Sequence, residues 1–469
     1  MSGSVRRGLG VVLGAAILVG AAACGGGGFS GEGSSGASTG SVRMLVNITP
    51  NLTKGYWEQL VKPFEEANPG VDVKIEAPSG QGVKDTLPQL LAAGNAPDVV
   101  ETLMADKTLA PQMLDLTDQA WTKDTPLAEQ AALDGKVYTV GVGQQAQSLV
   151  FYNKAAFTKA GITEPPKTLD ELTAAMAKLK AAGYLPLQTA GDYVTGLQLL
   201  QLSDPSIASA HPDWYQQVKA KQVSVGQTML PLLQRYESWI KSGYVDKNAL
   251  GLDDVNAQTN FLSGKSAMYV MGSWFVRTAD QAKPAFDLGV FAAPTEAGQA
   301  APGPQGVTMA APYMVLKSTK QRDLAVKLVQ WLVTDEKAVQ SQLSQDGNFR
   351  KGYTDQLSPL GKQVQDILDQ APKHVAQGEG YGANTLPQGF NTEWNKAVQS
   401  LYIGKNAKEA AATIGQTVEG LTTAPVLRDL SHRLGIELPI TEGVCAVLEG
   451  KVRLTELVEG LMGRRPTGE

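Results

Sequence analysis

The residues best suited to catalysis lie in surroundings that argue against it. Two pairs of neighbouring carboxylates, Glu65-Glu66 and Asp253-Asp254, occupy polar stretches with nothing nearby to perturb their pKa values. The three histidines and two cysteines show no metal-ligand spacing. No glycine-rich phosphate loop follows a strand in the pattern that nucleotide binding needs. We therefore expect no catalytic residue, no metal site and no cofactor.

Amide side chains are concentrated at one point in the chain. Gln144, Gln145 and Gln147 lie in an extended, mostly apolar run. Amides are costly to bury without hydrogen-bond partners, so their partners must come either from a bound polar ligand or from solvent around a loop. A ligand-binding site and a solvated loop are both consistent with this run.

The composition limits the class of protein. A chain of 469 residues is too long for one ordinary hydrophobic core, so two or three domains are expected. The net charge of −5 argues against nucleic acid as a partner. Cys24 and Cys445 lie far apart in different contexts, which gives no disulfide framework.

The N-terminal residues have the layout of a secretory signal. Arg6-Arg7 precede an apolar stretch over 9–23, and small residues lead to Cys24. This arrangement resembles a bacterial lipoprotein signal peptide over 1–24, in which Cys24 carries the lipid; the alternative is ordinary cleavage after Ala23. Residues 25–40 are rich in glycine and serine, which predicts a flexible linker.

The chain after the linker alternates between strand and helix patterns. Residues 42–48 and 71–75 read as strands, and an apolar helical pattern between them ends at Asn68-Pro69-Gly70. Residues 134–140 read as another strand. Thr168 followed by Glu171 predicts a capping box at the start of a helix. Strand, helix, strand is typical of parallel α/β architecture.

Two stretches carry a family resemblance. Ser148–Lys154 with the capped helix that follows, and Phe261–Met268 with Gly272-Ser273-Trp274, resemble the sugar-type extracellular solute-binding proteins (family 1) of ABC importers. The resemblance covers roughly 41–410. It implies an α/β, two-lobed fold of the periplasmic-binding-protein type II-like class, with hinge crossings and a small α-helical C-terminal appendage. The expected first lobe is 41–147 with 307–346, and the expected second lobe is 148–306 with 347–413.

The same resemblance implies where a ligand binds. Sugars need flat aromatic faces for their C–H patches and amide or carboxylate groups for their hydroxyls. Trp274 matches the family's cleft tryptophan, with a packing role as the alternative. The predicted ligand contacts are Trp274, Gln145, Gln147, Glu101, Thr102, Asp106, Asp192, Tyr193, Asn51, Asn384, Gln388 and Trp394.

The last residues resemble a different family. Gly415–Gly420 and Gly435–Glu442 are similar to the C-terminus of NAD(P)-dependent glycerol-3-phosphate dehydrogenase. We expect 414–469 to form a tail of two or three short helices, including 425–434 and 441–448, that docks loosely or stays mobile. Glu419 matches a residue that contacts the nucleotide in that family. No dinucleotide fingerprint precedes it, so dehydrogenase activity is expected to be absent.

Together these patterns predict a lipid-anchored extracellular binding protein, not an enzyme. It would capture a sugar or oligosaccharide and deliver it to ABC permease subunits, contacting the membrane through its anchor only, as a monomer. One rival is a dehydrogenase, which NADH oxidation with dihydroxyacetone phosphate would reveal. A second is a binding protein for peptides, polyamines or metal chelates.

Overall fold

The computed structural model describes residues 40–49, 51–78, 82–106, 108–191, 193–353, 357–375, 390–448, 452 and 456–457. Contacts along the chain separate it into two units, Met1–Ala37 and Ser38–Glu469, and the described residues all belong to the second. The predicted signal peptide, its Cys24 and the linker as far as residue 39 therefore lie outside the described residues.

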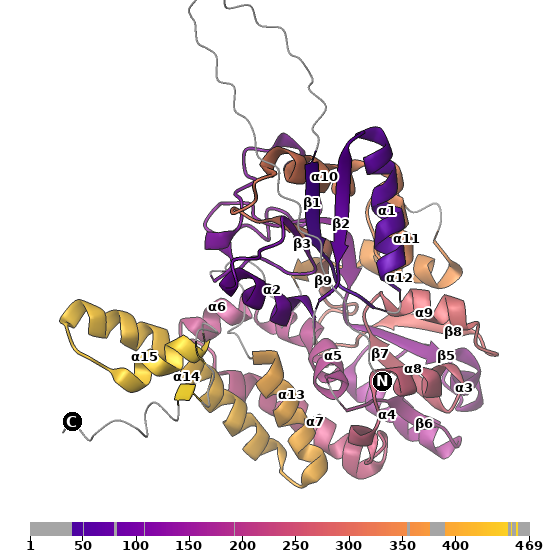
Figure 1. The fold of residues 1–469 in the computed structure, drawn as a ribbon. Helices are drawn as coiled ribbons and strands as arrows, with labels where there is room; N and C mark the ends of the chain where they lie inside the picture. Colours follow the sequence, from indigo (N-terminus) through magenta and orange to yellow (C-terminus); the bar gives the residue numbers. More distant parts are fainter. Residues whose placement is uncertain are drawn as a thin grey trace, which may run out of the picture. The chain divides into compact units, whose positions relative to one another are not determined.

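Two β-sheets form within the described residues (Figure 1). The first has the strand order β10-β9-β3-β1-β2, with β4 also paired to β9, and the second has the order β6-β7-β5-β8. The first contains β1 (Gly40–Leu45), β2 (Val71–Glu76), β3 (Val99–Glu101), β4 (Val140–Ala146), β9 (Gln305–Val315) and β10 (Lys373–Val375). The second contains β5 (Leu149–Asn153), β6 (Leu185–Gln188), β7 (Ser266–Met271) and β8 (Leu288–Ala292).

Helices connect the strands and pack against both sheets. The described α-helices are α1 (Lys54–Ala67), α2 (Val83–Ala92), α3 (Lys154–Lys159), α4 (Leu169–Ala181), α5 (Val194–Ala210), α6 (Trp214–Lys219), α7 (Val225–Ser242), α8 (Asp254–Leu262), α9 (Phe275–Ala282), α10 (Arg322–Thr334), α11 (Glu336–Gln345), α12 (Pro359–Gln370), α13 (Phe390–Ser400), α14 (Ala407–Leu434) and α15 (Pro439–Leu448). Short 3₁₀ turns lie at Ala110–Gln112, Ala120–Asp124, Ala249–Gly251 and Leu401–Ile403. Both sheets thus combine with helices, as the α/β prediction requires.

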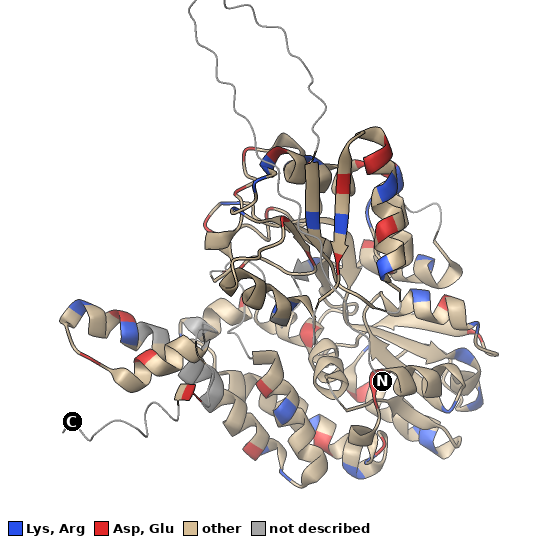
Figure 2. Cartoon of the chain, in the orientation of Figure 1, with Lys and Arg blue, Asp and Glu red and all other residues tan. Residues whose placement is uncertain are grey.

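The first lobe is built on parallel strands with an amphipathic helix against them. β1 pairs in parallel with both β2 and β3. The Thr53 side chain accepts a hydrogen bond from the backbone of Tyr56 and so caps α1, which buries Trp57 and Phe64. On its outer face α1 carries both positive and negative residues (Figure 2). One helix face thus goes to the core and the other to solvent.

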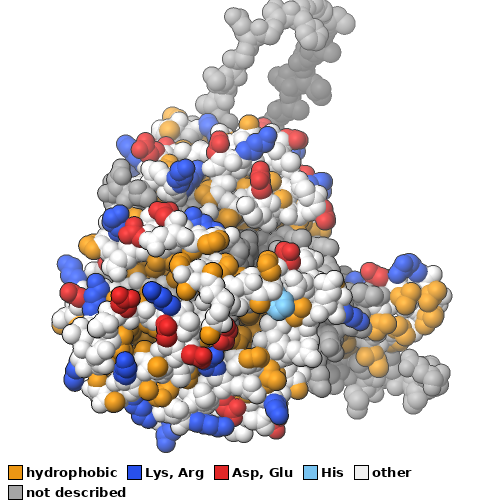
Figure 3. Space-filling model, turned by 180° about the vertical axis from the view of Figure 1, so that it is seen from behind, with side chains coloured by type: hydrophobic (Ala, Val, Ile, Leu, Met, Phe, Trp, Pro, Cys, Tyr) orange, Lys and Arg blue, Asp and Glu red, His pale blue; other side chains and the backbone are white. Residues whose placement is uncertain are grey.

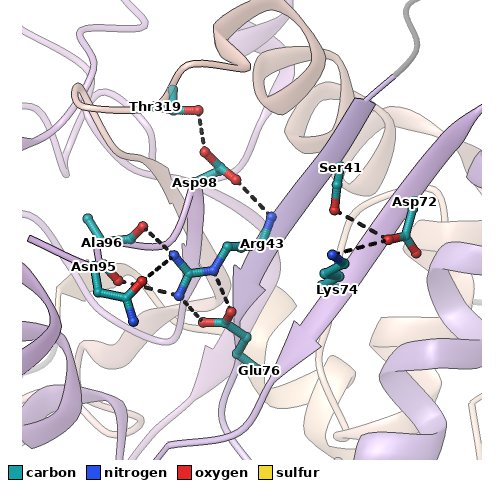
Figure 4. A network of polar contacts seen from close by, with 9 residues as sticks. All are labelled: Ser41, Arg43, Asp72, Lys74, Glu76, Asn95, Ala96, Asp98 and Thr319. Carbon is teal, nitrogen blue, oxygen red and sulfur yellow. Dashed lines mark hydrogen bonds and ion pairs between the residues drawn. The ribbon is translucent and has the colours of Figure 1, made fainter. Parts of the chain in front are cut away.

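A polar network around Arg43 joins the three parallel strands (Figure 4). The Arg43 guanidinium binds the Glu76 carboxylate at 2.6 and 3.1 Å and donates to the Ala96 carbonyl at 3.0 Å. The Asp98 carboxylate accepts the Arg43 backbone N–H at 2.8 Å and the Thr319 hydroxyl. These bonds fix the segment before β3 and therefore the position of Glu101 at its end.

The second lobe follows its local sequence signals closely. Thr168 and Glu171 form the predicted capping box at the start of α4. β5 pairs with β7 and β8, both antiparallel, while β6 runs parallel to β7. The parallel strands β6 and β7 therefore end at the same edge of the sheet.

Three segments cross between the sheets. β4 continues through Gln147 and Ser148 into β5, and β9 runs antiparallel to β4 on its way back. A third segment, 346–349, leaves α11 and pairs with Gln144 through Phe349. At Gly143 a Cβ atom would lie 2.7 Å from the Phe349 carbonyl oxygen, so glycine is required for this close approach.

Two expectations about the strands differ from the structure. The strand expected over 134–140 begins only at Val140, because Asp134 and Gly135 form a turn with positive φ angles of 50° and 78°. β10 pairs with β9 in the first sheet, although it falls within the range expected in the second lobe. The chain therefore enters the first sheet one additional time, through β10.

The tail is dominated by one long helix. α14 runs for 28 residues from a capping box at Asn406 to a left-handed Gly435, where a short helix beginning only at Pro425 was expected. Its first turns bury Ala407, Ala410 and Ile414 in the second lobe's core. α14 packs against α7 and α13, and its first turns are therefore docked on the second lobe.

Candidate functional site

Polar side chains from two of the crossing segments converge on Asp346. Gln145, on β4, donates to the Asp346 carboxylate at 3.1 Å. The side chains of Asn51 and Asn348 also hydrogen-bond to it. Burial outweighs these bonds and raises the Asp346 pKa to about 6. This carboxylate, which sequence analysis did not identify, links two of the predicted ligand contacts.

A second buried carboxylate, Glu101, lies at the end of β3. Its side chain is only 3% exposed, and it accepts the Asn47 backbone N–H at 2.9 Å and the Thr102 hydroxyl. Burial raises the Glu101 pKa to about 7, and the charge of Asp346 adds to the rise. Thr102 has a positive φ of 86° and donates its N–H to Pro312. We call Asn51, Glu101, Thr102, Gln145 and Asp346 the crossing cluster.

The crossing cluster is rich in acceptors. Among the groups that shift the pKa of Glu101 or Asp346 in the described part of the chain, none is a lysine or arginine. The carboxylates are held instead by amide, hydroxyl and backbone donors. Such a set binds hydroxyl or amine donors well and repels anions.

Trp274 lies beside the third crossing. It precedes α9 and is half-buried, with its ring folded over Gly272, where a Cβ would come within 2.0 Å of the indole. At Gly347, directly after Asp346, a Cβ would lie 2.5 Å from the Ser273 carbonyl oxygen. The turn that follows β7 in the second lobe carries Trp274 and therefore touches the segment that carries Asp346.

Gln147 has a different environment from Gln145. It is buried, donates to the Thr308 hydroxyl at 3.0 Å and accepts from Gln201 at 2.7 Å. Both polar atoms of its amide are thus bonded to the protein. The neighbouring Ser148 has a positive φ of 56°, which marks a sharp bend where β4 passes into β5. Gln147 accordingly secures this crossing.

Two other predicted contacts are placed apart from these hydrogen bonds. The Asp106 carboxylate accepts the backbone N–H groups of Thr108 and Leu109, both at 2.8 Å, and caps that turn. Tyr193 is 51% exposed at the start of α5, and its hydroxyl donates to Asp254 at 2.7 Å. These hydrogen bonds are made outside the crossing cluster.

The structure corrects the role predicted for Trp394. It was predicted to contact ligand, but it is 1% exposed within the second lobe's core, and its indole N–H donates to the Gly196 carbonyl at 2.8 Å. Its α13 neighbours Phe390 and Val398 are buried at helical spacing. Trp394 therefore packs α13 onto α5. Asp192, Asn384 and Gln388 lie outside the described residues.

A cavity near the crossings adds little to the site. It has a volume of about 730 Å³ and is lined by residues that include Gln144, Arg350, Lys351, Asp369 and Lys373. No residue of the crossing cluster lines it.

Within the described ranges, no three His, Cys, Asp or Glu residues are grouped to hold a metal ion. None of the helices in that same part of the chain is long and apolar enough to span a bilayer.

Comparison with known proteins gives a family match for most of the chain. Residues 49–339 match the model of the bacterial extracellular solute-binding proteins. A multiple sugar-binding protein from Streptococcus mutans is 25% identical over 335 residues, which cover 65% of this chain and 75% of that one.

Solved structures support the same fold. A chitin oligosaccharide binding protein superposes with a TM-score of 0.71 at 22% identity, covering 82% of this chain and 99% of that chain. A Bacillus licheniformis sugar transporter protein in complex with stachyose gives a TM-score of 0.66 at 19% identity, covering 81% and 100%. The two-lobed binding-protein fold is thus confirmed.

The tail matches a second family. Residues 392–459 match the model of the NAD-dependent glycerol-3-phosphate dehydrogenase C-terminus, beginning before the predicted boundary at 414. A glycerol-3-phosphate dehydrogenase from Nitrosospira multiformis is 40% identical over 70 residues, which are 15% of this chain and 21% of that one. The predicted resemblance of the tail is confirmed.

Proposed function

Because this chain belongs to the bacterial extracellular solute-binding protein family, we propose that it captures a sugar or oligosaccharide between its two lobes and delivers it to an ABC importer. The sugar-binding names of its relatives agree with this class of ligand. The tail spans only about a fifth of its dehydrogenase relative, and no dehydrogenase activity is assigned to it.

The observation that carries the proposal is the crossing cluster beside Trp274. Hydroxyl groups of a sugar would donate to the Asp346 and Glu101 carboxylates and accept from the Gln145 amide. The exposed part of the Trp274 indole would cover a C–H face of the sugar ring. Asp106, Asp192, Tyr193, Asn384 and Gln388 remain proposed ligand contacts.

The position of the crossing cluster also suggests how binding closes the lobes. Gln145 and Asp346 lie on segments that pass from one sheet to the other, while Glu101 and Trp274 belong to opposite lobes. A ligand that contacts all four stabilises the closed arrangement over the open one. The permease would then recognise the closed form.

A calorimetric titration with a panel of sugars tests the proposal. We expect at least one mono- or oligosaccharide to bind, and Trp274→Ala to weaken that ligand by about tenfold or more through loss of the aromatic face. Trp331→Ala is the matched control, because Trp331 is also half-buried but packs on Phe64 in the first lobe. Equal affinity in the Trp274→Ala variant would contradict the assigned site, and failure of every sugar would contradict the ligand class.

We further propose that Cys24 carries a lipid that holds the protein at the outer face of the cell membrane. In a bacterial host that processes lipoproteins, the wild-type chain should partition into the detergent phase, and Cys24→Ser should move to the aqueous phase because it has no thiol to acylate. Cys445→Ser is the control, since Cys445 is buried in α15. Detergent partitioning that survives Cys24→Ser would refute the anchor.

A further inference from the structure

The titratable groups that influence one another around the crossing cluster are acids. Burial raises the pKa of Glu101, of Tyr56 on α1 and of Tyr313 on β9, and negative charge adds to each rise. This charge comes from Asp346 for Glu101, from both carboxylates for Tyr56, and from Glu101 for Tyr313. No lysine or arginine of the described residues is among the groups that act on these four side chains. A positive charge placed beside two such carboxylates is therefore stabilised.

This one-signed character is confined to the site. The chain as a whole has 41 lysines and arginines against 46 aspartates and glutamates. Figure 3 shows side chains of both signs interspersed over the face of the molecule that it draws. Arg277, which lines a small recess together with Asn348, acts on Asp280 and is not among the groups that shift the pKa of Asp346. The acidic surroundings of the crossing cluster therefore do not follow from the composition.

The hydrogen bonds of the crossing cluster leave acceptors without donors. Both donors to Glu101, the Asn47 backbone N–H and the Thr102 hydroxyl, bond to the same carboxylate oxygen, Oε2. The Asn348 side chain hydrogen-bonds to Asp346, yet its own Oδ1 is buried and has no hydrogen-bond partner in the described part of the chain. An ammonium group brings three N–H donors and no acceptor, whereas a hydroxyl brings one donor and two acceptor lone pairs. The ammonium group is the better match.

The aromatic side of the site favours a cation as well. Trp274 is half-buried on the turn that touches the segment carrying Asp346. The face of an indole ring attracts a positive charge and also covers the C–H groups of a sugar ring. A bare metal ion fits less well, because calcium takes about six to eight oxygen ligands and no three His, Cys, Asp or Glu residues of the described chain are grouped to hold one. A cation attached to a sugar uses both the carboxylates and the indole.

We propose that the sugar captured between the lobes carries a protonated amine, which donates to the Asp346 carboxylate and brings its charge close to Glu101. This inference rests on the proposed function and narrows its ligand class to amino sugars. Asp346 is partly exposed and makes the direct contact, while the buried Glu101 acts through its charge. The Trp274 indole covers the apolar face of the same sugar. An N-acetylated amine has lost the charge and so loses this interaction.

Matched sugars titrated calorimetrically into the full chain at neutral pH test the inference. Glucosamine, galactosamine and the oligomers of glucosamine are each compared with the neutral parent sugar and with the N-acetyl form, which differ only in the substituent at C2. At least one amine should bind about tenfold or more tightly than both of its counterparts. Neutral sugars that bind while no amine binds more tightly would overturn the inference and leave the proposed function standing. Failure of every sugar would overturn both, as would tighter binding of spermidine than of every sugar.

Asp346→Asn gives a second measurement, because the amide keeps the shape of the carboxylate and removes its charge. The affinity for the best amine should fall about tenfold or more, whereas the affinity for its neutral parent should change by less than about threefold. Asp118→Asn is the control: Asp118 is exposed and lies outside the crossing cluster, so its replacement should leave both affinities unchanged. Equal losses for the amine and its neutral parent would mean that Asp346 only maintains the shape of the site, and the inference would be wrong.

Discussion

Replacing Trp394 with alanine is expected to lower the free energy of unfolding by about 4 kcal/mol, since the change removes a fully buried indole and leaves a cavity. The ring packs in the core of the second lobe, and its N–H is bonded to the Gly196 carbonyl. The Gly196 carbonyl also loses the indole N–H as a donor, which adds to the cost. Urea unfolding followed by tryptophan fluorescence and by circular dichroism measures the effect.

Ligand affinity separates this packing role from the binding role first assigned to Trp394. If the residue only packs α13 onto α5, the folded Trp394→Ala variant should bind the best sugar within about twofold of wild type. Trp394→Phe is a milder companion that keeps an aromatic ring and loses the hydrogen bond. Normal stability together with lost affinity would restore the original prediction.

The protein should be more stable at pH 5 than at pH 8 in the absence of ligand. Burial raises the Glu101 pKa from 4.5 to about 7, so the folded state holds a proton that the unfolded chain releases. The stability from this proton is complete below pH 4.5 and is lost as the pH rises through 7. Asp346, with its pKa raised to about 6, acts in the same direction. Glu101 alone should account for roughly 2–3 kcal/mol between the two pH values.

Glu101→Gln isolates this contribution. An amide of the same shape cannot titrate, so the difference in unfolding free energy between pH 5 and pH 8 should shrink by roughly that amount. Glu129→Gln is the control, because the Glu129 side chain is exposed to solvent. A Glu101→Gln variant with the full pH dependence of wild type would place the titrating group elsewhere.

Features that depend on nearby residues could be predicted from the sequence. The capping box at Thr168 and Glu171 forms because both partners lie within one turn of each other. The end of α1 at Asn68 and the strand at Val71 follow equally local signals. Trp394 was misassigned although the spacing of Phe390, Trp394 and Val398 indicates a core position. The glycine- and proline-rich segment around it resembles one that closes over the ligand in the family, and this resemblance suggested a ligand contact.

The crossing cluster could be predicted only in part. Gln145 could be identified because amides are unusual in an apolar run, but its hydrogen-bond partner could not be identified from the sequence. Asp346 is separated from Gln145 by 201 residues, and nothing around it in the sequence marks a site. The long α14 was missed because Gly415, Gly420 and Pro425 interrupt the helical pattern, which packing against α7 and α13 overrides.

Because α14 is one continuous helix, it limits where the chain can be truncated to separate the solute-binding body from the tail. The dehydrogenase-like match starts at residue 392, yet Trp394, Ala407 and Ile414 are all interior residues of the sugar-receptor half. A truncation at the start of the match would remove side chains that belong to the core of the second lobe. The receptor-like part and the dehydrogenase-like part share one continuous helix. A shortened receptor should therefore retain α14 at least through Ile414.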